Sequence, residues 1–173
     1  MSSLLIITPV EKLQKKINKI VSSMQNCTGI YVSLNKTQKS IEETLKKNKI
    51  KTEKIFFIDC VTSEKQKEEV LHISPRDLEK LSYAISSFIK EIKGEKFLII
   101  DALSTLLIYN DENKVAAFVK EIADYASENN ARVIAFSPST KGEELLNKIF
   151  NFFDKVEKEE DEIKTRKKQD LIY

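Results

Sequence analysis

The segment Phe97–Ile108, with the sequence FLIIDALSTLLI, constrains the fold of this chain more than any other. Its first apolar run is continuous rather than alternating, and it ends at an acid, Asp101. A continuous apolar strand is typical of a parallel sheet that helices cover on both faces. An acid at the carboxyl end of such a strand lies at the edge where open α/β sheets bind ligands. The segment therefore predicts an α/β fold in which Asp101 lies at the carboxyl ends of the strands, where ligands bind.

Further apolar runs indicate that strands and helices alternate along the chain. The strands are short and rich in β-branched or aromatic residues, which suits a buried sheet. Between them, apolar residues recur at three- and four-residue steps, which indicates helices with one buried face. This alternation predicts a mostly parallel sheet with right-handed crossovers, in a three-layer αβα arrangement. The expected strands are residues 4–8, 30–34, 55–59, 97–101 and 131–137, and the expected helices are about 10–26, 37–49, 74–94, 110–125 and 142–150.

Three segments are harder to assign. Residues 61–72 are polar and lack a clear period, so we expect a long loop or a short exposed helix. Ser74 and Pro75 match a helix start, with the serine as cap and the proline at the first position. From about residue 157 to 173 the charge changes from acidic to basic. This pattern suits either an exposed antiparallel hairpin, with opposite charges paired across its strands, or a tail, and both alternatives stay open.

The length and composition are typical of one folded domain. With 173 residues and 41% hydrophobic residues, the chain is long enough to bury a core, so we expect a single domain over residues 1–173. No apolar run approaches the roughly 20 residues of a membrane-spanning helix. The first apolar run has no basic segment before it, so we expect no signal peptide and a cytoplasmic location.

The cysteines and the single histidine do not form a metal-binding pattern. Cys27 and Cys60 are far apart and belong to no CxxC pair, and His72 is the one histidine. This spacing indicates neither a zinc site nor a disulfide framework, so two reduced thiols and no bound metal are expected. No catalytic role is assigned to His72, because no partner residue lies near it in the sequence.

The charge of the chain does not favour nucleic acid as a partner. The 29 basic and 27 acidic side chains give a net charge of +2, which is too balanced for a protein that binds nucleic acid over its whole surface. The basic cluster Lys164–Lys168 could contact a phosphate backbone. The neighbouring acidic block Glu157–Glu162 opposes that contact. We therefore expect neither nucleic acid nor a membrane as the partner.

Four segments together carry a family resemblance. They are YVSL at Tyr31–Leu34, FID at Phe57–Asp59, LIIDALS at Leu98–Ser104 and VIAFS at Val133–Ser137. In this order they resemble the RecA/KaiC branch of the P-loop ATPases, especially the KaiC-like proteins common in archaea, and LIIDALS resembles a Walker B strand. The resemblance covers roughly residues 4–160. It implies a RecA-like sheet, in a domain related to ATPases that assemble as rings or filaments.

The residues after the first expected strand depart from that family. A P-loop reads G-x-x-x-x-G-K-[ST], because its backbone N–H groups wrap a phosphate and its lysine reaches the terminal phosphates. Here the segment Thr8–Lys12 reads TPVEK, and the first glycine is Gly29. Glu11 adds negative charge at a helix end that otherwise attracts anions. We therefore expect the Walker A phosphate site to be missing, with Lys12 either a solvated helix lysine or a relic of the phosphate-binding lysine.

The residues that would catalyse hydrolysis also differ from the family. In KaiC-like proteins the strand that resembles YVSL is followed by acidic residues, one of which activates water, whereas this chain has Asn35 and Lys36 there. An amide is no general base, so no catalytic residue is expected. Asp101 stands where the family holds Mg²⁺ through water, but without a triphosphate a lone carboxylate holds this ion weakly. Both Asp101 and Asp59 therefore either keep such a role or cap the turn after their strand through backbone N–H groups.

Two functional hypotheses follow. The first is a catalytically inactive RecA/KaiC-like domain, a pseudo-ATPase that acts as a protein-interaction or regulatory module, needs no cofactor, and pairs with an active KaiC-like ATPase or with itself. A receiver domain phosphorylated on Asp59 is disfavoured, because the first strand ends without the acidic pair that would hold Mg²⁺. The second hypothesis is a nucleotide- or small-ligand-binding protein with an altered phosphate site at the carboxyl edge of the sheet. That site would use Thr8, Asn35, Asp101 and Ser137.

Overall fold

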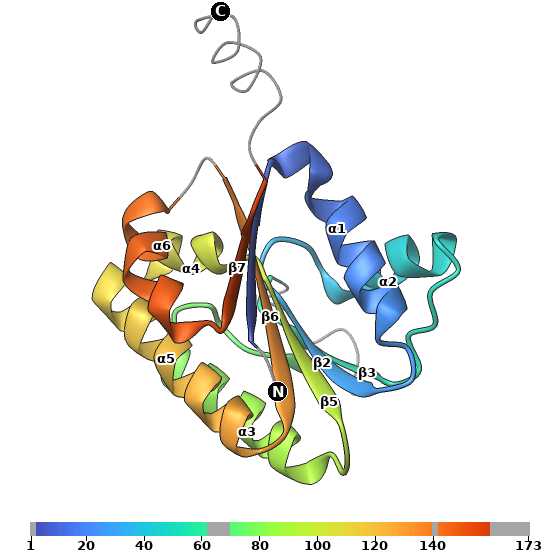
Figure 1. The fold of residues 1–173 in the computed structure, drawn as a ribbon. Helices are drawn as coiled ribbons and strands as arrows, with labels where there is room; N and C mark the ends of the chain where they lie inside the picture. The colour runs from blue at the N-terminus through green and yellow to red at the C-terminus, as the bar shows by residue number, and fades with distance from the viewer. Residues whose placement is uncertain (1–2, 62–69, 140–141, 160–173) are drawn as a thin grey trace, which may run out of the picture.

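A seven-stranded parallel sheet forms the centre of the molecule (Figure 1). The computed structural model describes residues 3–61, 70–139 and 142–159. Across the sheet the described strands follow the order β4-β3-β2-β5-β6-β1-β7, and each neighbouring pair is parallel. The strands are β1 (Leu4–Thr8), β2 (Thr28–Ser33), β3 (Ile55–Asp59), β4 (Leu71–His72), β5 (Lys96–Asp101), β6 (Ala131–Pro138) and β7 (Lys155–Lys158).

Helices cover both faces of this sheet (Figure 1). α1 and α2 lie on one face, and α3, α5 and α6 lie on the other, as right-handed crossovers require when the chain first moves toward β4 and then back toward β7. The prediction of a three-layer α/β fold is confirmed. The helices are α1 (Val10–Ser23), α2 (Gln38–Lys47), α3 (Leu78–Glu91), α4 (Leu106–Tyr109), α5 (Glu112–Glu128) and α6 (Glu143–Ile149), with 3-10 turns η1 (Leu103–Thr105) and η2 (Phe150–Phe152).

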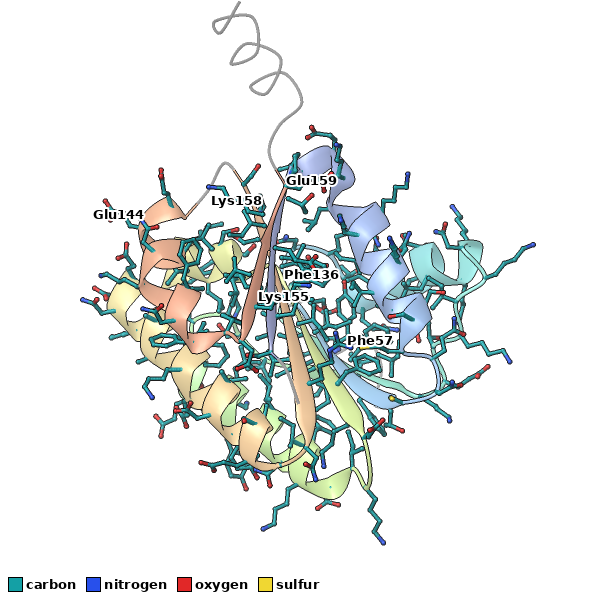
Figure 2. The ribbon with its side chains drawn as sticks, in the orientation of Figure 1. Phe57, Phe136, Glu144, Lys155, Lys158 and Glu159 are labelled. Atoms are coloured by element: carbon teal, nitrogen blue, oxygen red, sulfur yellow. The ribbon has the colours of Figure 1, made fainter. Side chains whose placement is uncertain are left out.

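Two cores lie on either side of the sheet. Along β6, Ile134 and Phe136 pack with α1 and α2, whereas Val133 and Ala135 pack with α3, α5 and α6. Figure 2 shows Phe57 and Phe136 on the α1 and α2 side. Successive side chains of a strand point to opposite faces. The alternation therefore also fixes the face on which each polar residue at a strand end lies.

A glycine in β2 makes room for an aromatic ring of the neighbouring strand. Gly29 in β2 lies opposite Phe97 in β5. A Cβ atom at Gly29 would lie only 2.0 Å from the Phe97 ring. The missing side chain thus gives space to an aromatic ring, which is a known use of glycine inside a strand.

The short strand β4 lies in the segment 61–72, which was expected to be a loop or a short helix. Of residues 61–72, the part that the structure describes ends in β4, whose two residues pair in parallel with Ile58 and Asp59. A strand of this length contains too few residues for a period to be seen. The prediction for this end of the segment is therefore wrong.

The start of α3 also differs from the prediction. The helix begins at Leu78, and the side chain of Asp77 caps it by accepting a hydrogen bond from the N–H of Lys80. Ser74 instead accepts a hydrogen bond from the N–H of Arg76, within the turn that precedes the helix. Serine and aspartate are both good caps, so the sequence alone did not separate the two positions.

The carboxyl-terminal segment, 157–173, is described only as far as residue 159. There β7 pairs in parallel with β1 at the edge of the sheet, so the described part is neither a hairpin nor a tail. The alternatives for residues 160–173 lie outside the described residues. In the part of the chain that the structure describes, no helix is both long enough and apolar enough to span a bilayer.

Candidate functional site

The carboxyl ends of β5, β6 and β1 lie side by side, since these strands are neighbours in the sheet. They carry Asp101, Ser137 and Thr8, all of which are buried. The side-chain alternation directs Thr8 and Asp101 toward α1 and α2, and Ser137 toward the opposite face. Asn35 follows β2 and is exposed. Of the four residues in the second hypothesis, the structure thus brings Thr8 and Asp101 to one side of the sheet.

The carboxylate of Glu159 lies at the end of β1, where α1 begins. Its Oε2 accepts a hydrogen bond from the Thr8 hydroxyl at 3.2 Å, and its Oε1 accepts one from Nζ of Lys12 at 3.2 Å. Nζ of Lys16 lies 3.8 Å from Oε2. Figure 2 shows Glu159 beside the first turn of α1. Lys12 is therefore a partly exposed lysine of α1 that is bound to a carboxylate of the same chain.

The pairing of β7 with β1 positions Glu159. The N–H of Glu159 donates to the carbonyl of Ile7 at 2.9 Å, so the backbone at this point continues the parallel ladder. The hydrogen bond from Lys12 lowers the pKa of Glu159, with further contributions from the Thr8 hydroxyl and the charge of Lys16. The negative charge is thus held at the end of β1. Sequence reasoning missed this residue because the contact joins positions about 150 apart in a segment without apolar periodicity.

Asp101 makes its side-chain hydrogen bond inside the protein. The hydroxyl of Tyr31 in β2 donates to Oδ2 of Asp101 at 2.6 Å, and both side chains are buried. Burial raises the pKa of Asp101, although the Tyr31 hydroxyl and the charge of Lys36 act in the opposite direction. Burial and the negative charge of Asp101 raise the pKa of Tyr31, which keeps its proton for this bond. The expected alternative of a cap made by backbone N–H groups is replaced here by a buried phenol.

Asn35 and Ser137 have separate surroundings. The amide oxygen of Asn35 accepts a hydrogen bond from the hydroxyl of Thr105, at the end of η1. The Ser137 hydroxyl is buried and has no hydrogen-bond partner among the described residues. Asn35 therefore contacts the segment after β5, whereas Ser137 faces the core that contains α5 and α6. These contacts do not join the two residues to Thr8.

Asp59 holds the start of α2. Its Oδ2 accepts a hydrogen bond from the N–H of Gln38, the first residue of that helix, and its Oδ1 accepts one from the N–H of Val61. A carboxylate at a helix N-terminus is favoured by the helix dipole. The interpretation of Asp59 as a residue that binds backbone N–H groups after its strand is confirmed. Among the described residues, no three potential ligands of the types His, Cys, Asp and Glu lie together as a metal site.

An apolar groove that was not predicted from the sequence lies between α3 and β4. Its volume is about 380 Å³ and apolar atoms line almost all of it. Phe56 stacks on Phe88 next to the groove, with ring centroids 5.5 Å apart, and Tyr83 is 76% exposed. The residues of α3 that line the groove recur at three- and four-residue steps. This spacing could have indicated from the sequence that α3 has a second, outward-facing side with apolar residues. The lining residues are Leu71, Ile73, Lys80, Tyr83, Ala84, Ser87, Phe88 and Glu91.

Comparison of sequences relates the chain to one family. Residues 10–150 match the model of a family described as protein of unknown function (DUF835). The match covers most of the chain. None of the curated proteins matches it.

Comparison of structures relates the fold to proteins of the archaeon Pyrococcus horikoshii. The KaiC-like protein PH0186 is 11% identical with a TM-score of 0.67, over 90% of this chain and 69% of its own. The uncharacterized protein PH0321, solved in complex with an unknown peptide, is 12% identical with a TM-score of 0.69, over 91% and 76%. The protein PH0250 is 11% identical with a TM-score of 0.61, over 92% and 82%. At these identities the likeness shows the fold alone, which is RecA-like and KaiC-like.

Proposed function

We propose, on the premise that the chain belongs to the family described as protein of unknown function (DUF835) and has a KaiC-like fold, that it is a pseudo-ATPase acting as a protein-interaction or regulatory module. Two features support this function. The polar contacts at the end of β1 oppose nucleotide binding, and the apolar groove beside α3 suits a protein partner.

The observation that carries the proposal is the carboxylate of Glu159 at the end of β1. In P-loop proteins the phosphates bind at the start of the helix that follows the first strand, where the lysine reaches them. Here Glu159 takes the hydrogen bonds of Thr8 and Lys12 at that point. An incoming phosphate would have to displace this carboxylate from Lys12. The segment Thr8–Lys12 also has no glycine that would let the backbone wrap a phosphate.

The residues near the other strand ends do not supply the chemistry of hydrolysis. Asn35 stands where the family resemblance places a general base, and its amide accepts a hydrogen bond from Thr105. An amide does not remove a proton from water at useful strength. Asp101 is bound to the Tyr31 hydroxyl in a buried pair, which opposes coordination of a metal ion by the same oxygen. These contacts support a domain without ATPase activity.

The groove beside α3 is the surface that we assign to the partner. Exposed apolar side chains surround it, including Tyr83 at 76%, Phe56 at 47% and Leu71 at 38% exposure. Lys80 and Glu91 line it from the same helix, eleven positions and thus about 16 Å apart. A peptide segment with apolar side chains and opposite charges at its two ends would complement both. The similar protein PH0321 was solved in complex with an unknown peptide, which supports only that the partner is a peptide segment. An active KaiC-like ATPase or a second copy of this chain could present such a segment.

Thermal unfolding with ATP, ADP and GTP, each with and without Mg²⁺, tests the lost nucleotide site. A ligand at one hundred times its dissociation constant would stabilise the native state by about 2.7 kcal/mol, which amounts to several degrees in a domain of this size. We expect no shift up to millimolar nucleotide for the wild type. Glu159→Gln removes the negative charge while keeping the side-chain shape, so it separates charge repulsion from the missing loop. A stabilising shift in the wild type would instead support the altered phosphate site of the second hypothesis.

Selection of peptides from a displayed random library tests the groove. Peptides with apolar side chains should be enriched on the wild-type protein and should bind Tyr83→Ser at least about tenfold more weakly, a loss of roughly 1.4 kcal/mol. The matched control is Val10→Ser, because Val10 is also exposed, at 59%, but begins α1 on the other side of the sheet. Enriched peptides whose affinity falls equally in both variants, or in neither, would refute the assignment of the groove.

A further inference from the structure

A second cavity lies above the carboxyl ends of β2, β3 and β4, away from β1. Its volume is about 480 Å³, which is within the range of small-molecule sites. Its wall comes from the residues that follow β2 and β3, from the connection between β4 and α3, and from the end of α4. β2 is followed by α2 on one face of the sheet, whereas its neighbour β5 is followed by α5 on the other face, which is the topology of a ligand-binding crevice in open α/β folds.

The described side chains that line this cavity include a cation, Arg76. Arg76 lies over the ring of Tyr109, with its guanidinium carbon 5.3 Å from the ring centroid, and both residues line the cavity. Among the described residues, no carboxylate lines this cavity and none forms an ion pair with Arg76. An arginine on an aromatic ring is well suited to bind a carboxylate or phosphate through two parallel hydrogen bonds.

His72 is part of the same wall. Both of its ring nitrogens are shielded from solvent and have no hydrogen-bond partner among the described residues. Its Nδ1 lies 4.0 Å from Oδ2 of Asp59, which is beyond hydrogen-bond length. The Asp59 carboxylate itself accepts hydrogen bonds from the backbone of α2 and of the turn after β3. Because neither nitrogen is accessible, His72 contributes to the wall of the cavity but presents no hydrogen-bonding atom to its open space.

We infer that this cavity binds a small organic oxyanion, a carboxylate or phosphate monoester with an apolar body. Arg76 pairs with the anionic group of this ligand. The apolar body lies against Tyr109, Leu34 and Ile73, which supply the apolar part of the wall. The site uses neither the end of β1 nor the contact between Glu159 and Lys12, so it stands or falls independently of the proposed loss of nucleotide binding.

The test is a titration of ¹⁵N-labelled protein, followed by the amide signals of residues 34–35, 60–61, 72–74 and 76. The probes are phenyl phosphate, benzoate, inorganic phosphate and neutral phenol. Phenyl phosphate and benzoate should shift these signals saturably, and phenol should bind at least about tenfold more weakly because it has no charge for Arg76. Inorganic phosphate, which has no apolar body, should also bind more weakly than phenyl phosphate. No saturable shift with either organic anion up to about 10 mM would overturn the inference.

Two variants and a matched control assign the binding to named side chains. Arg76→Gln should weaken the binding of both organic anions at least about tenfold. Tyr109→Leu should weaken phenyl phosphate more than inorganic phosphate, because it removes the aromatic surface and keeps the cation. Lys90→Gln removes a positive charge from α3 outside the cavity, and it should change the affinity less than about twofold. Equal effects of Arg76→Gln and Lys90→Gln would overturn the inference, since they would indicate only a general attraction of anions.

Discussion

Removal of the Tyr31 hydroxyl should destabilise the protein by an amount that depends on pH. In Tyr31→Phe the buried carboxylate of Asp101 loses a hydrogen-bond donor that lies 2.6 Å away, a length typical of a bond to a charged oxygen. A hydrogen bond to a charged group contributes about 1.5–3 kcal/mol, and one between neutral groups about 1 kcal/mol. We therefore expect a loss of about 2–3 kcal/mol at neutral pH, and of about 1 kcal/mol once Asp101 is protonated.

The direction of the pH dependence follows from the pKa of Asp101, which burial raises in the folded protein. A raised pKa means that the folded state holds this proton more tightly than the unfolded state. The stability gained from this tighter proton binding is fully present below the pKa of an unfolded aspartate, about 4. It is lost as the pH rises through the pKa of Asp101 in the folded protein. Tyr31 lowers this pKa, so Tyr31→Phe should raise it further. The difference in unfolding free energy between variant and wild type should therefore grow from acidic to neutral pH.

Urea unfolding of both proteins at several pH values measures this difference. At neutral pH the loss corresponds to a fall in melting temperature of about 5–10 °C for a domain of this size. The matched control is Tyr83→Phe, which removes the same hydroxyl from a tyrosine that is 76% exposed and should change stability by less than about 0.5 kcal/mol. A loss in Tyr31→Phe that equals the control, or that stays constant with pH, would refute the described role of the buried pair.

Two substitutions and one chemical modification test other contacts. Gly29→Ala should cost about 2–3 kcal/mol because its Cβ would overlap the ring of Phe97, and Phe97→Leu in the same chain should recover part of the loss; a neutral effect in urea unfolding would contradict the close packing. Asp59→Ala should cost about 1–2 kcal/mol and speed hydrogen exchange in the first turn of α2, whereas unchanged exchange there would argue against its capping role. Burial raises the pKa of Cys60 to about 12, so in native protein near pH 8 a disulfide reagent should modify Cys27 first, and equal rates for both thiols would contradict the burial of Cys60.

The central part of the fold could be predicted because its signals are local. The apolar runs of β1, β3 and β5 are continuous and bounded by polar residues, and their predicted positions agree with the structure to within about one residue. Thr37 caps α2 and Asp111 caps α5 through their side chains, as residues of these types do at helix starts. Each of these signals depends on residues close together in the sequence.

The edges of the sheet could not be predicted in the same way. β4 has two residues, and β7 reads KVEK, a charged strand whose residues are mostly exposed at the edge of the sheet. Edge strands are often short or charged, because such features discourage pairing with other chains. These same features remove the apolar pattern from which a strand is recognised.

The contacts of the candidate site were also beyond the reach of the sequence. The choice of Thr8 and Asp101 followed from their positions after apolar strands, and both lie on the side of the sheet that faces α1 and α2. Their partners are Glu159 and Tyr31, which are separated from them by 151 and 70 positions in the sequence. Such pairs depend on the order of strands in the sheet, which a strand pattern alone does not specify. Ser137 differs because its position in β6 directs it to the opposite face.

A titration of ¹⁵N-labelled protein with ATP and Mg²⁺ tests the central claim most directly, because it reports on the residues at the end of β1 themselves. The carboxylate of Glu159 binds Thr8 and Lys12 there, so the account predicts no saturable shift of the amide signals of residues 8 and 10–12 up to about 5 mM nucleotide. Saturable shifts confined to these signals would contradict it, since they would show that nucleotide displaces Glu159 and binds at the start of α1.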